Sequence, residues 1–183
     1  MSMVMARAGM ASTIRTLGTM WAMHVANICN ALIEVDPANK AAYQQNAENY
    51  LGQLDALDRD IRAAFADIPK QRRRVITTHD AFEYYGDAYG VEFLAAQGVS
   101  EDAEPSARDI ARLIQQIKKE KITAIFVENI SSARLMDRIA KETGAKIGGE
   151  LFTDALSGPD GPAPTYLDMF RHNVGALTEA LSS

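Results

Sequence analysis

The fold is decided by RRVITTHDAFEYYGDAYGVEFLAAQG, residues 73–98, where two short apolar runs flank an amphipathic segment. The β-branched run RRVITT predicts a strand, DAFEYYGDAYG predicts a short helix ending in glycine, and VEFLAAQG predicts the next strand. A strand, a helix and a strand in this order form the unit of a parallel sheet. The stretch also places His79 and Asp80 directly after the first strand, in a chain with only three histidines.

The same alternation continues to the carboxyl end of the chain. Helices are predicted over 105–121, 131–144 and 166–183, and strands over 122–129 and 145–152. The strand ITAIFVEN is almost entirely apolar, as a sheet covered on both faces requires. The helix over 105–121 has its predicted buried stripe at Ala107, Ile110, Ala111, Leu113, Ile114 and Ile117. We therefore expect an α/β fold with a parallel sheet and helices on both of its faces.

A long helix is predicted before the first strand, over DPANKAAYQQNAENYLGQLDALDRDIRAAFADIP. Asp36 is a candidate N-cap, Pro37 suits the first turn, and Pro69 ends the pattern. Some 29 residues at 1.5 Å each make a rod of about 43 Å. Such a helix fits either a coiled coil or helix bundle, or a spine that lies along one domain or joins two. Its apolar seam is formed by Tyr43, Ala47, Tyr50, Leu54, Leu57, Ile61, Ala64 and Ile68.

The composition excludes several classes of protein. Of 183 residues, 47% are hydrophobic and 23% are charged, which is typical of a globular domain. The 19 basic and 24 acidic residues are scattered, so no basic face for nucleic acid is expected. Cys29 is the single cysteine, which excludes a disulfide framework and a CxxC site.

The first 18 residues are expected to be weakly structured. They are rich in methionine, but Arg7 and Arg15 interrupt any apolar core of a signal peptide. We see no clear signal peptide in this stretch.

Three predicted strands are each followed or ended by a potential metal ligand. His79 follows the first, Glu128 ends ITAIFVEN, and Asp154 follows the last. Because the carboxyl ends of parallel strands meet at one edge of a sheet, these side chains are expected to converge there. One imidazole and one or two carboxylates suit a borderline divalent metal. Taken singly, His79 also fits a structural histidine, Asp154 a turn or cap, and Glu128 a helix cap.

Other polar residues and motifs are weaker candidates for a functional site. His24 and His172 lie in predicted helices and fit packing or surface positions. The glycine-rich stretches lack the spacing of a phosphate loop or of a nucleophile elbow. No catalytic centre is expected, and the chain is predicted not to be an enzyme.

From about residue 25 onward, four stretches in this order resemble the TroA-like zinc and manganese solute-binding proteins of bacterial ABC importers. They are DPANKAAYQQNAENYLGQLDALDRDI, VITTHDAFEYYGDAYG, ITAIFVENISSARLMDRIAKETGAKIGGELFTDALS and GPAPTYLDMFRHNV. The resemblance implies two α/β lobes joined by a spine helix, with the metal between them. Residues 38–69 then correspond to the spine, 70–183 to the carboxyl-terminal lobe, and 1–37 to a partly helical remnant.

The resemblance also implies the roles of the site residues. His79 matches the third ligand of the family's four-ligand pattern, and Asp154 matches the fourth, with Asp80 and Glu128 as residues lining the site. A histidine at the third position is similar to the zinc-type pattern, so zinc is favoured over manganese. The family implies an extracytoplasmic location and an ABC permease as partner.

The chain departs from the family at the first two ligands. The lobe that carries the first histidine is absent, and the place of the second is taken by ASTIR, residues 11–15. Two ligands imply weak binding, and uncovered apolar surface favours self-association into a dimer or larger oligomer. The alternative is a metal-free structural or interaction module that keeps the fold without transport.

Overall fold

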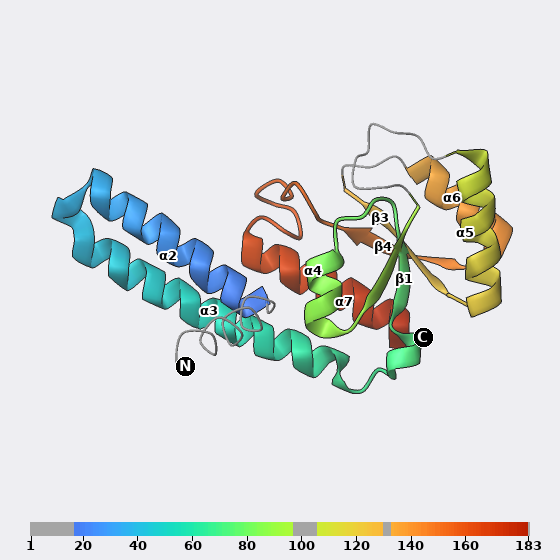
Figure 1. Cartoon of the computed structure of the whole chain (residues 1–183), viewed down its shortest axis with the longest axis horizontal. Coiled ribbons are helices and arrows are strands. Elements are labelled where there is room, and N and C mark those ends of the chain that lie inside the picture. The colour runs from blue at the N-terminus through green and yellow to red at the C-terminus, as the bar shows by residue number, and fades with distance from the viewer. Residues whose placement is uncertain (1–16, 97–105, 130–132, 183) are drawn as a thin grey trace, which may run out of the picture. The chain divides into compact units, whose positions relative to one another are not determined.

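A computed structural model describes residues 17–96, 106–129 and 133–182 of the chain. The chain divides into two compact units, one extending to Asp60 and the other starting at Ile61. Figure 1 shows the elements of both. Within the described ranges, no helix combines the length and the apolar character needed to cross a membrane. The prediction that the first 18 residues are weakly structured falls almost wholly outside the described residues.

From residue 17 onward, unit 1 is described, and it contains two α-helices joined by a tight turn. Helix α2 spans Leu17–Val35, the 3₁₀ helix η1 spans Pro37–Asn39, and α3 spans Lys40–Ala66 and continues into unit 2. The predicted long helix is therefore present, but it begins after a 3₁₀ turn. Asp36 makes no side-chain hydrogen bond to the backbone of η1. Its carboxylate instead accepts hydrogen bonds from Asn39 Nδ2 at 2.7 Å and Tyr43 OH at 2.8 Å.

The apolar seam of α3 departs from the prediction near its end. Leu54, Leu57 and Ile61 are buried as expected, whereas Ala64 is exposed and Phe65 is buried in its place. Two successive steps of four residues from Leu57 keep Phe65 on the apolar side of the helix. The larger aromatic side chain therefore occupies the core position.

Unit 2 contains a four-stranded sheet in the order β2-β1-β3-β4, with every pair of neighbours parallel. Its strands are β1 (Arg74–Thr77), β2 (Glu92–Ala95), β3 (Ala124–Glu128) and β4 (Lys146–Leu151). Its helices are η2 (Lys70–Arg72), α4 (Glu83–Tyr89), α5 (Ala107–Glu120), α6 (Ala133–Thr143) and α7 (Tyr166–Ser182). The predicted parallel α/β architecture is confirmed.

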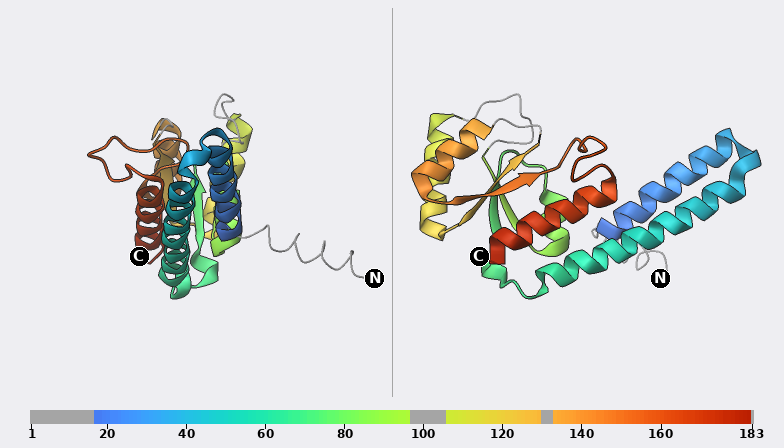
Figure 2. Two further views of the ribbon diagram at one scale, coloured as in Figure 1. Left: turned by 90° about the vertical axis from the view of Figure 1, so that its left-hand side faces the viewer. Right: turned by 180° about the vertical axis from the view of Figure 1, so that it is seen from behind.

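Helices cover both faces of the sheet, as Figure 1 and the rear view in Figure 2 show. On one face, α5 and α6 pack on the sheet around Ile76 of β1 and Ile125 of β3. The α5 residues in this core are Ile110, Leu113, Ile114 and Ile117. Ala107 and Ala111, which the sequence also placed in the stripe, are exposed. The stripe is narrower than predicted because the four larger side chains already cover the sheet.

The other face is built largely from aromatic side chains around α4 and α7. Tyr85 of α4 lies 6.4 Å from Phe65, 6.0 Å from Phe93 and 5.9 Å from Phe170 of α7, measured between ring centroids. Arg73 secures the end of α3 beside this cluster. Its guanidinium donates to the carbonyls of Phe65, Ile68 and Tyr89 at 2.6, 2.8 and 3.3 Å. These contacts set the position from which β1 starts.

Glycine allows a close approach between β4 and its neighbours. A Cβ atom on Gly148 would lie 2.8 Å from Phe126 Cζ and 2.9 Å from Ala180 Cβ. The register of β3 against β4 shifts at this point, between Ile125 and Phe126. The glycines of this strand thus let it pair closely here.

Candidate metal site

The topology brings three predicted ligands to one edge of the sheet. Strand β3, which ends at Glu128, lies between β1 and β4. His79 follows β1 and Asp154 follows β4. The carboxyl ends of parallel strands therefore place all three side chains together, as the sequence analysis expected.

Glu128 is buried and bonded to the segment that follows β1. Its Oε1 accepts a hydrogen bond from the backbone N–H of Thr78 at 2.9 Å, and its Oε2 accepts one from the backbone N–H of His79 at 3.2 Å. The same Oε2 atom forms a hydrogen bond with Nδ1 of the His79 ring. Only 1% of Glu128 and 5% of His79 is exposed, so water does not compete for these bonds.

The carboxylate determines which tautomer the ring adopts. Burial raises the pKa of the Glu128 carboxyl, and the hydrogen bonds from His79 and Thr78 oppose this shift. When Glu128 is ionised, its carboxylate only accepts hydrogen bonds, and Nδ1 of His79 then carries the proton that it donates. The Nε2 atom of the neutral ring is then left with a lone pair.

Asp154 lies opposite that nitrogen. Its Oδ2 atom is 3.4 Å from His79 Nε2, and 66% of its side chain is exposed. When the ring is neutral and carries its proton on Nδ1, both facing atoms are electron-pair donors, and no hydrogen bond joins them. A cation between them, or a proton on Nε2, would balance their charge. The arrangement joins an oriented imidazole to an accessible carboxylate.

Two asparagines that were not among the predicted site residues hold the segment leading to Asp154. Asn173 of α7 is buried and accepts from Phe152 N–H at 2.9 Å while donating to Phe152 C=O at 2.7 Å. Asn129 accepts from Thr153 N–H at 3.3 Å and donates to Ala155 C=O at 3.1 Å. Asn129 could have been found from the sequence, because it directly follows an apolar strand. Asn173 lies within a helix, where no sequence pattern indicates its role.

Asp80 is not brought to this cluster. It is exposed and lines a separate hollow of about 490 Å³ together with Lys70, Phe82 and Glu83. The N-cap of α4 is Phe82, with no side-chain capping bond, so Asp80 does not cap that helix. The ring of His79 is oriented by Glu128 instead.

The other two histidines fit the structural roles expected of them. His172 Nε2 lies 3.0 Å from the carbonyl oxygen of Glu150, and its ring packs edge-on against Phe152 at 5.1 Å. His24 is an exposed residue of α2 in unit 1.

Two groups of the candidate site face each other, the imidazole of His79 and the carboxylate of Asp154. Among the residues that the structure describes, no group of three or more His, Cys, Asp or Glu side chains is placed to hold a metal ion. Glu128 belongs to the cluster through the far side of the imidazole ring. The hydroxyls of Thr78 and Thr153 lie buried at this edge, without hydrogen-bond partners in the described structure.

Comparisons with known proteins show which family this chain belongs to. The family model described as ZnuA, zinc-uptake complex component A periplasmic, matches residues 19–180. Manganese-binding lipoprotein MntA of Bacillus subtilis is 35% identical over 167 residues, which cover 88% of this chain and 55% of the relative. Iron-binding protein YfeA of Yersinia pestis is 32% identical over 157 residues, covering 86% and 50%. The chain spans about half the length of the curated relatives it matches.

Solved structures show the same fold. The periplasmic zinc-binding protein TroA from Treponema pallidum superposes with a TM-score of 0.86 at 32% identity, covering 92% of this chain and 63% of that chain. A manganese-bound periplasmic metal-binding protein from Candidatus Liberibacter asiaticus gives a TM-score of 0.79 at 28% identity, covering 92% and 62%. The TroA-like fold that the sequence predicted is confirmed.

Proposed function

Because this chain belongs to the ZnuA family, that of zinc-uptake complex component A, we propose that it binds a divalent transition metal as the carboxyl-terminal lobe of an ABC importer's solute-binding protein. Members of this family are solute-binding proteins of ABC transporters and not enzymes, in agreement with the sequence analysis. In this proposal residues 38–69 act as the spine helix, 70–183 as the metal-binding lobe, and 1–37 as a remnant of the preceding segment.

The observation that carries the proposal is the separation of 3.4 Å between His79 Nε2 and Asp154 Oδ2. Two ligand atoms, each about 2.0–2.1 Å from a tetrahedral zinc ion, lie roughly 3.3–3.4 Å apart. The two atoms therefore have a spacing that suits one shared cation. Asp154 is exposed enough for an ion to reach it, and His79 is held in a single orientation.

Glu128 supports the site without touching the ion. A ligating histidine commonly donates its other N–H to a carboxylate, which fixes the ring and makes the ligating nitrogen more basic. The bond between Glu128 and His79 Nδ1 has this form. We therefore assign Glu128 a positioning role, and Asp80 none.

The proposed ion is zinc. One imidazole and one carboxylate suit Zn²⁺, Mn²⁺ and Fe²⁺ alike, and the names of the relatives include manganese, iron and zinc. The histidine at position 79 supports zinc, since the resemblance associates histidine there with the zinc-type pattern. The affinity of these two ligands alone is expected to be far below that of a complete four-ligand site.

The relatives also support a location and a partner. The names of several describe a periplasmic metal-binding protein or substrate-binding lipoproteins of metal ABC transporters. We place this chain outside the cytoplasm on that basis, with the permease of an ABC importer as its partner. A second copy of the chain is a further candidate source of ligands, since α2 exposes four large apolar side chains. These are Met23, Ile28, Leu32 and Val35.

One observation favours a second candidate function. Because the described residues offer no third ligand, the chain also fits a metal-free interaction module that retains the fold. The two functions differ in a single measurable property, saturable metal binding at the edge formed by β1, β3 and β4.

The test is a calorimetric titration of the metal-free protein with Zn²⁺ and with Mn²⁺. His79→Ala and Asp154→Ala are compared with His24→Ala and Asp80→Ala, which remove the same residue types away from the two facing atoms. Saturable zinc binding that only the first pair abolishes supports the proposal. Absent binding, or equal loss in all four variants, favours the metal-free module. Sedimentation in the same buffer shows whether one ion is bound per chain or per dimer.

A further inference from the structure

A second cavity lies within unit 2 at the opposite end of the strands. It has a volume of about 450 Å³ and is lined where β1, β3 and β4 begin, by residues that include Arg74, Ala124 and Lys146. The turn after α5 and the last turns of α7 complete its walls. A volume of this size lies in the range of small-molecule sites.

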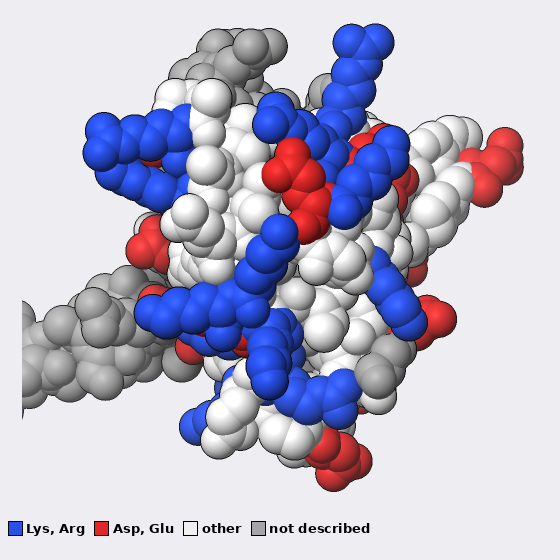
Figure 3. All heavy atoms as spheres, turned by 90° about the vertical axis from the view of Figure 1, so that its right-hand side faces the viewer, with Lys and Arg blue, Asp and Glu red and all other residues white. Residues whose placement is uncertain are grey.

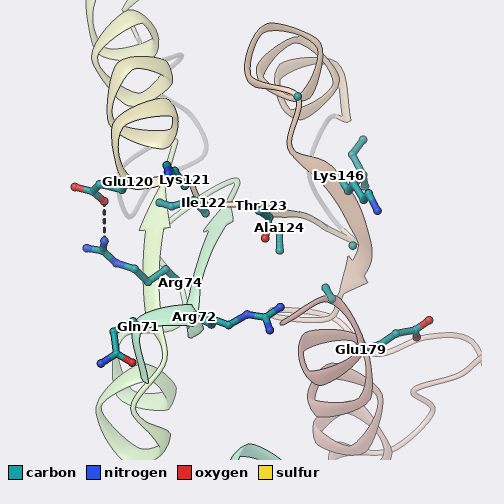
Figure 4. A pocket seen from close by; sticks show the side chains of 14 residues that line it. Gln71, Arg72, Arg74, Glu120, Lys121, Ile122, Thr123, Ala124, Lys146 and Glu179 are labelled. Carbon is teal, nitrogen blue, oxygen red and sulfur yellow. Dashed lines mark ion pairs between the residues drawn. The ribbon is translucent and has the colours of Figure 1, made fainter. Parts of the chain in front are cut away.

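Four cationic side chains from separate elements line this cavity. They are Arg72 of η2, Arg74 of β1, Lys121 after α5 and Lys146 of β4. Figure 4 shows Arg72 extending across the cavity from the side of β1 towards that of α7. Basic side chains also gather over the face of the molecule shown in Figure 3, with fewer acidic ones between them.

Most of this positive charge has no internal partner. Arg74 is neutralised by Glu92, at 2.6 Å, and by Glu120, at 3.1 Å. In the described part of the chain, Arg72, Lys121 and Lys146 form no ion pair. Glu179 also lines the cavity and is the one acidic group of the lining that does not bond to Arg74. The remaining charge of the lining is therefore positive.

Lys121 occupies a backbone conformation that glycine would adopt more easily. Its φ and ψ are 53° and 43°, in the left-handed region, where it ends α5. It is the only residue other than glycine with positive φ in the described structure. A side chain other than glycine costs about 1 kcal/mol in this conformation, and glycine is the usual residue at such helix ends. Here the position carries a lysine that lines the cavity.

We propose that this cavity is a second binding site, for a small molecule that carries clustered phosphate oxygens. Three cations from η2, the α5 turn and β4 line one cavity, and they match several anionic oxygens on one ligand. Ile122, Ala124, Ile147, Gly148 and Ala180 supply an apolar wall beside the cations. The ligand class is therefore an organic phosphate with an apolar part, either free or as the headgroup of an anionic lipid.

This site is independent of the proposed metal site. His79, Glu128 and Asp154 lie at the carboxyl ends of the strands, whereas the cations lie at the amino ends. Loss of one site by substitution is expected to leave the other unchanged.

The test uses the full chain, with pyrophosphate as the probe in a calorimetric titration at low ionic strength. Replacing Lys121 and Lys146 by glutamine is expected to weaken binding at least about tenfold, because two cations at contact distance are lost. The matched control is the double variant Lys118→Gln/Lys119→Gln. It removes two exposed charges at the end of α5 that do not line the cavity.

Lys121→Gly separates a binding role from a structural one. Glycine adopts the left-handed backbone conformation of position 121 without the steric cost of a side chain, so the midpoint of thermal unfolding is expected to rise. The affinity for pyrophosphate is expected to fall, because the cation is lost. Vesicles containing phosphatidylglycerol identify the source of the phosphate. Binding that pyrophosphate displaces indicates a headgroup, and binding of pyrophosphate alone indicates a free ligand. The proposal is overturned if pyrophosphate does not bind saturably, or if both double variants lose equal affinity.

Discussion

Glu128 accepts hydrogen bonds from both the backbone N–H and the ring Nδ1 of His79, across a separation of 49 residues in the chain. The first bond fixes the position of the His79 backbone, and the second fixes the orientation of its ring. A single buried carboxylate thus prepares the ring to present Nε2 towards Asp154. This relationship makes Glu128 the most informative position for a test of the site.

Glu128→Gln is expected to lower zinc affinity by about 10- to 100-fold. A glutamine can donate its amide N–H to Nδ1, which moves the ring proton to Nε2 and removes the lone pair needed for the metal. Calorimetric titration measures the effect. The control is Asp80→Asn, which neutralises a carboxylate that lies apart from the two facing atoms. Unchanged affinity in Glu128→Gln would show that the ring is oriented by other contacts.

Asn173→Ala is expected to lower the free energy of unfolding by about 2–3 kcal/mol, because it leaves the buried N–H and C=O of Phe152 without partners. Zinc affinity should fall as well, since this segment carries Asp154. Urea denaturation and calorimetry check the two effects. Asn173→Asp keeps the acceptor for the Phe152 N–H and loses the donor to the Phe152 C=O. It should therefore also lower the free energy of unfolding, because that carbonyl is left without its donor. Equal stability of Asn173→Ala and the parent protein would contradict the assigned role.

Gly148→Ala is expected to destabilise the protein by about 1–3 kcal/mol, because the new methyl group would overlap Phe126 and Ala180. Gly175→Ala is the matched control. It lies within α7, where a Cβ atom meets nothing within 4 Å. This control should stabilise by roughly 0.5–1 kcal/mol, as alanine does in a helix. Urea denaturation compares the two variants. A change in the free energy of unfolding that has the same sign in both would refute the packing argument.

The ion pair between Arg74 and Glu92 predicts a pH dependence. The hydrogen bond from Arg74 holds the pKa of Glu92 below its ordinary value of 4.5. The pair therefore contributes stability above pH 4.5, and this contribution is lost as the pH falls through the lowered pKa. Since the Glu92 side chain is 48% exposed, we expect less than about 1 kcal/mol at pH 7.

A double-mutant cycle with Arg74→Gln and Glu92→Gln measures this coupling by urea denaturation. The coupling energy should be largest near neutral pH and should decrease at acidic pH, as Glu92 becomes protonated. A coupling energy that is the same at neutral and at acidic pH would exclude the charge on Glu92 as its source.

Much of unit 2 was predictable because its elements are specified locally. The apolar runs of β1 and β3 and the periodic stripe of α5 identify strands and a helix without knowledge of their neighbours. The start of the long helix was less accurate. Asp36 bonds to the side chains of Asn39 and Tyr43 rather than to the backbone, and a 3₁₀ turn replaces the first helical turn. Whether the Asp36 carboxylate accepts from side chains or from backbone N–H groups depends on local geometry, which residue types do not reveal.

By itself, the sequence determined the alternation of strands and helices, and it placed His79 and Asp154 after the strands that carry them. These features follow from periodicity and from the direction of parallel strands. Only the tertiary structure decided that Glu128 orients the ring, that Asp80 lies apart from it, and that the Lys121 and Lys146 side chains share a cavity. These relationships join residues far apart in the chain, so they depend on which strands become neighbours and on distances of a few ångströms.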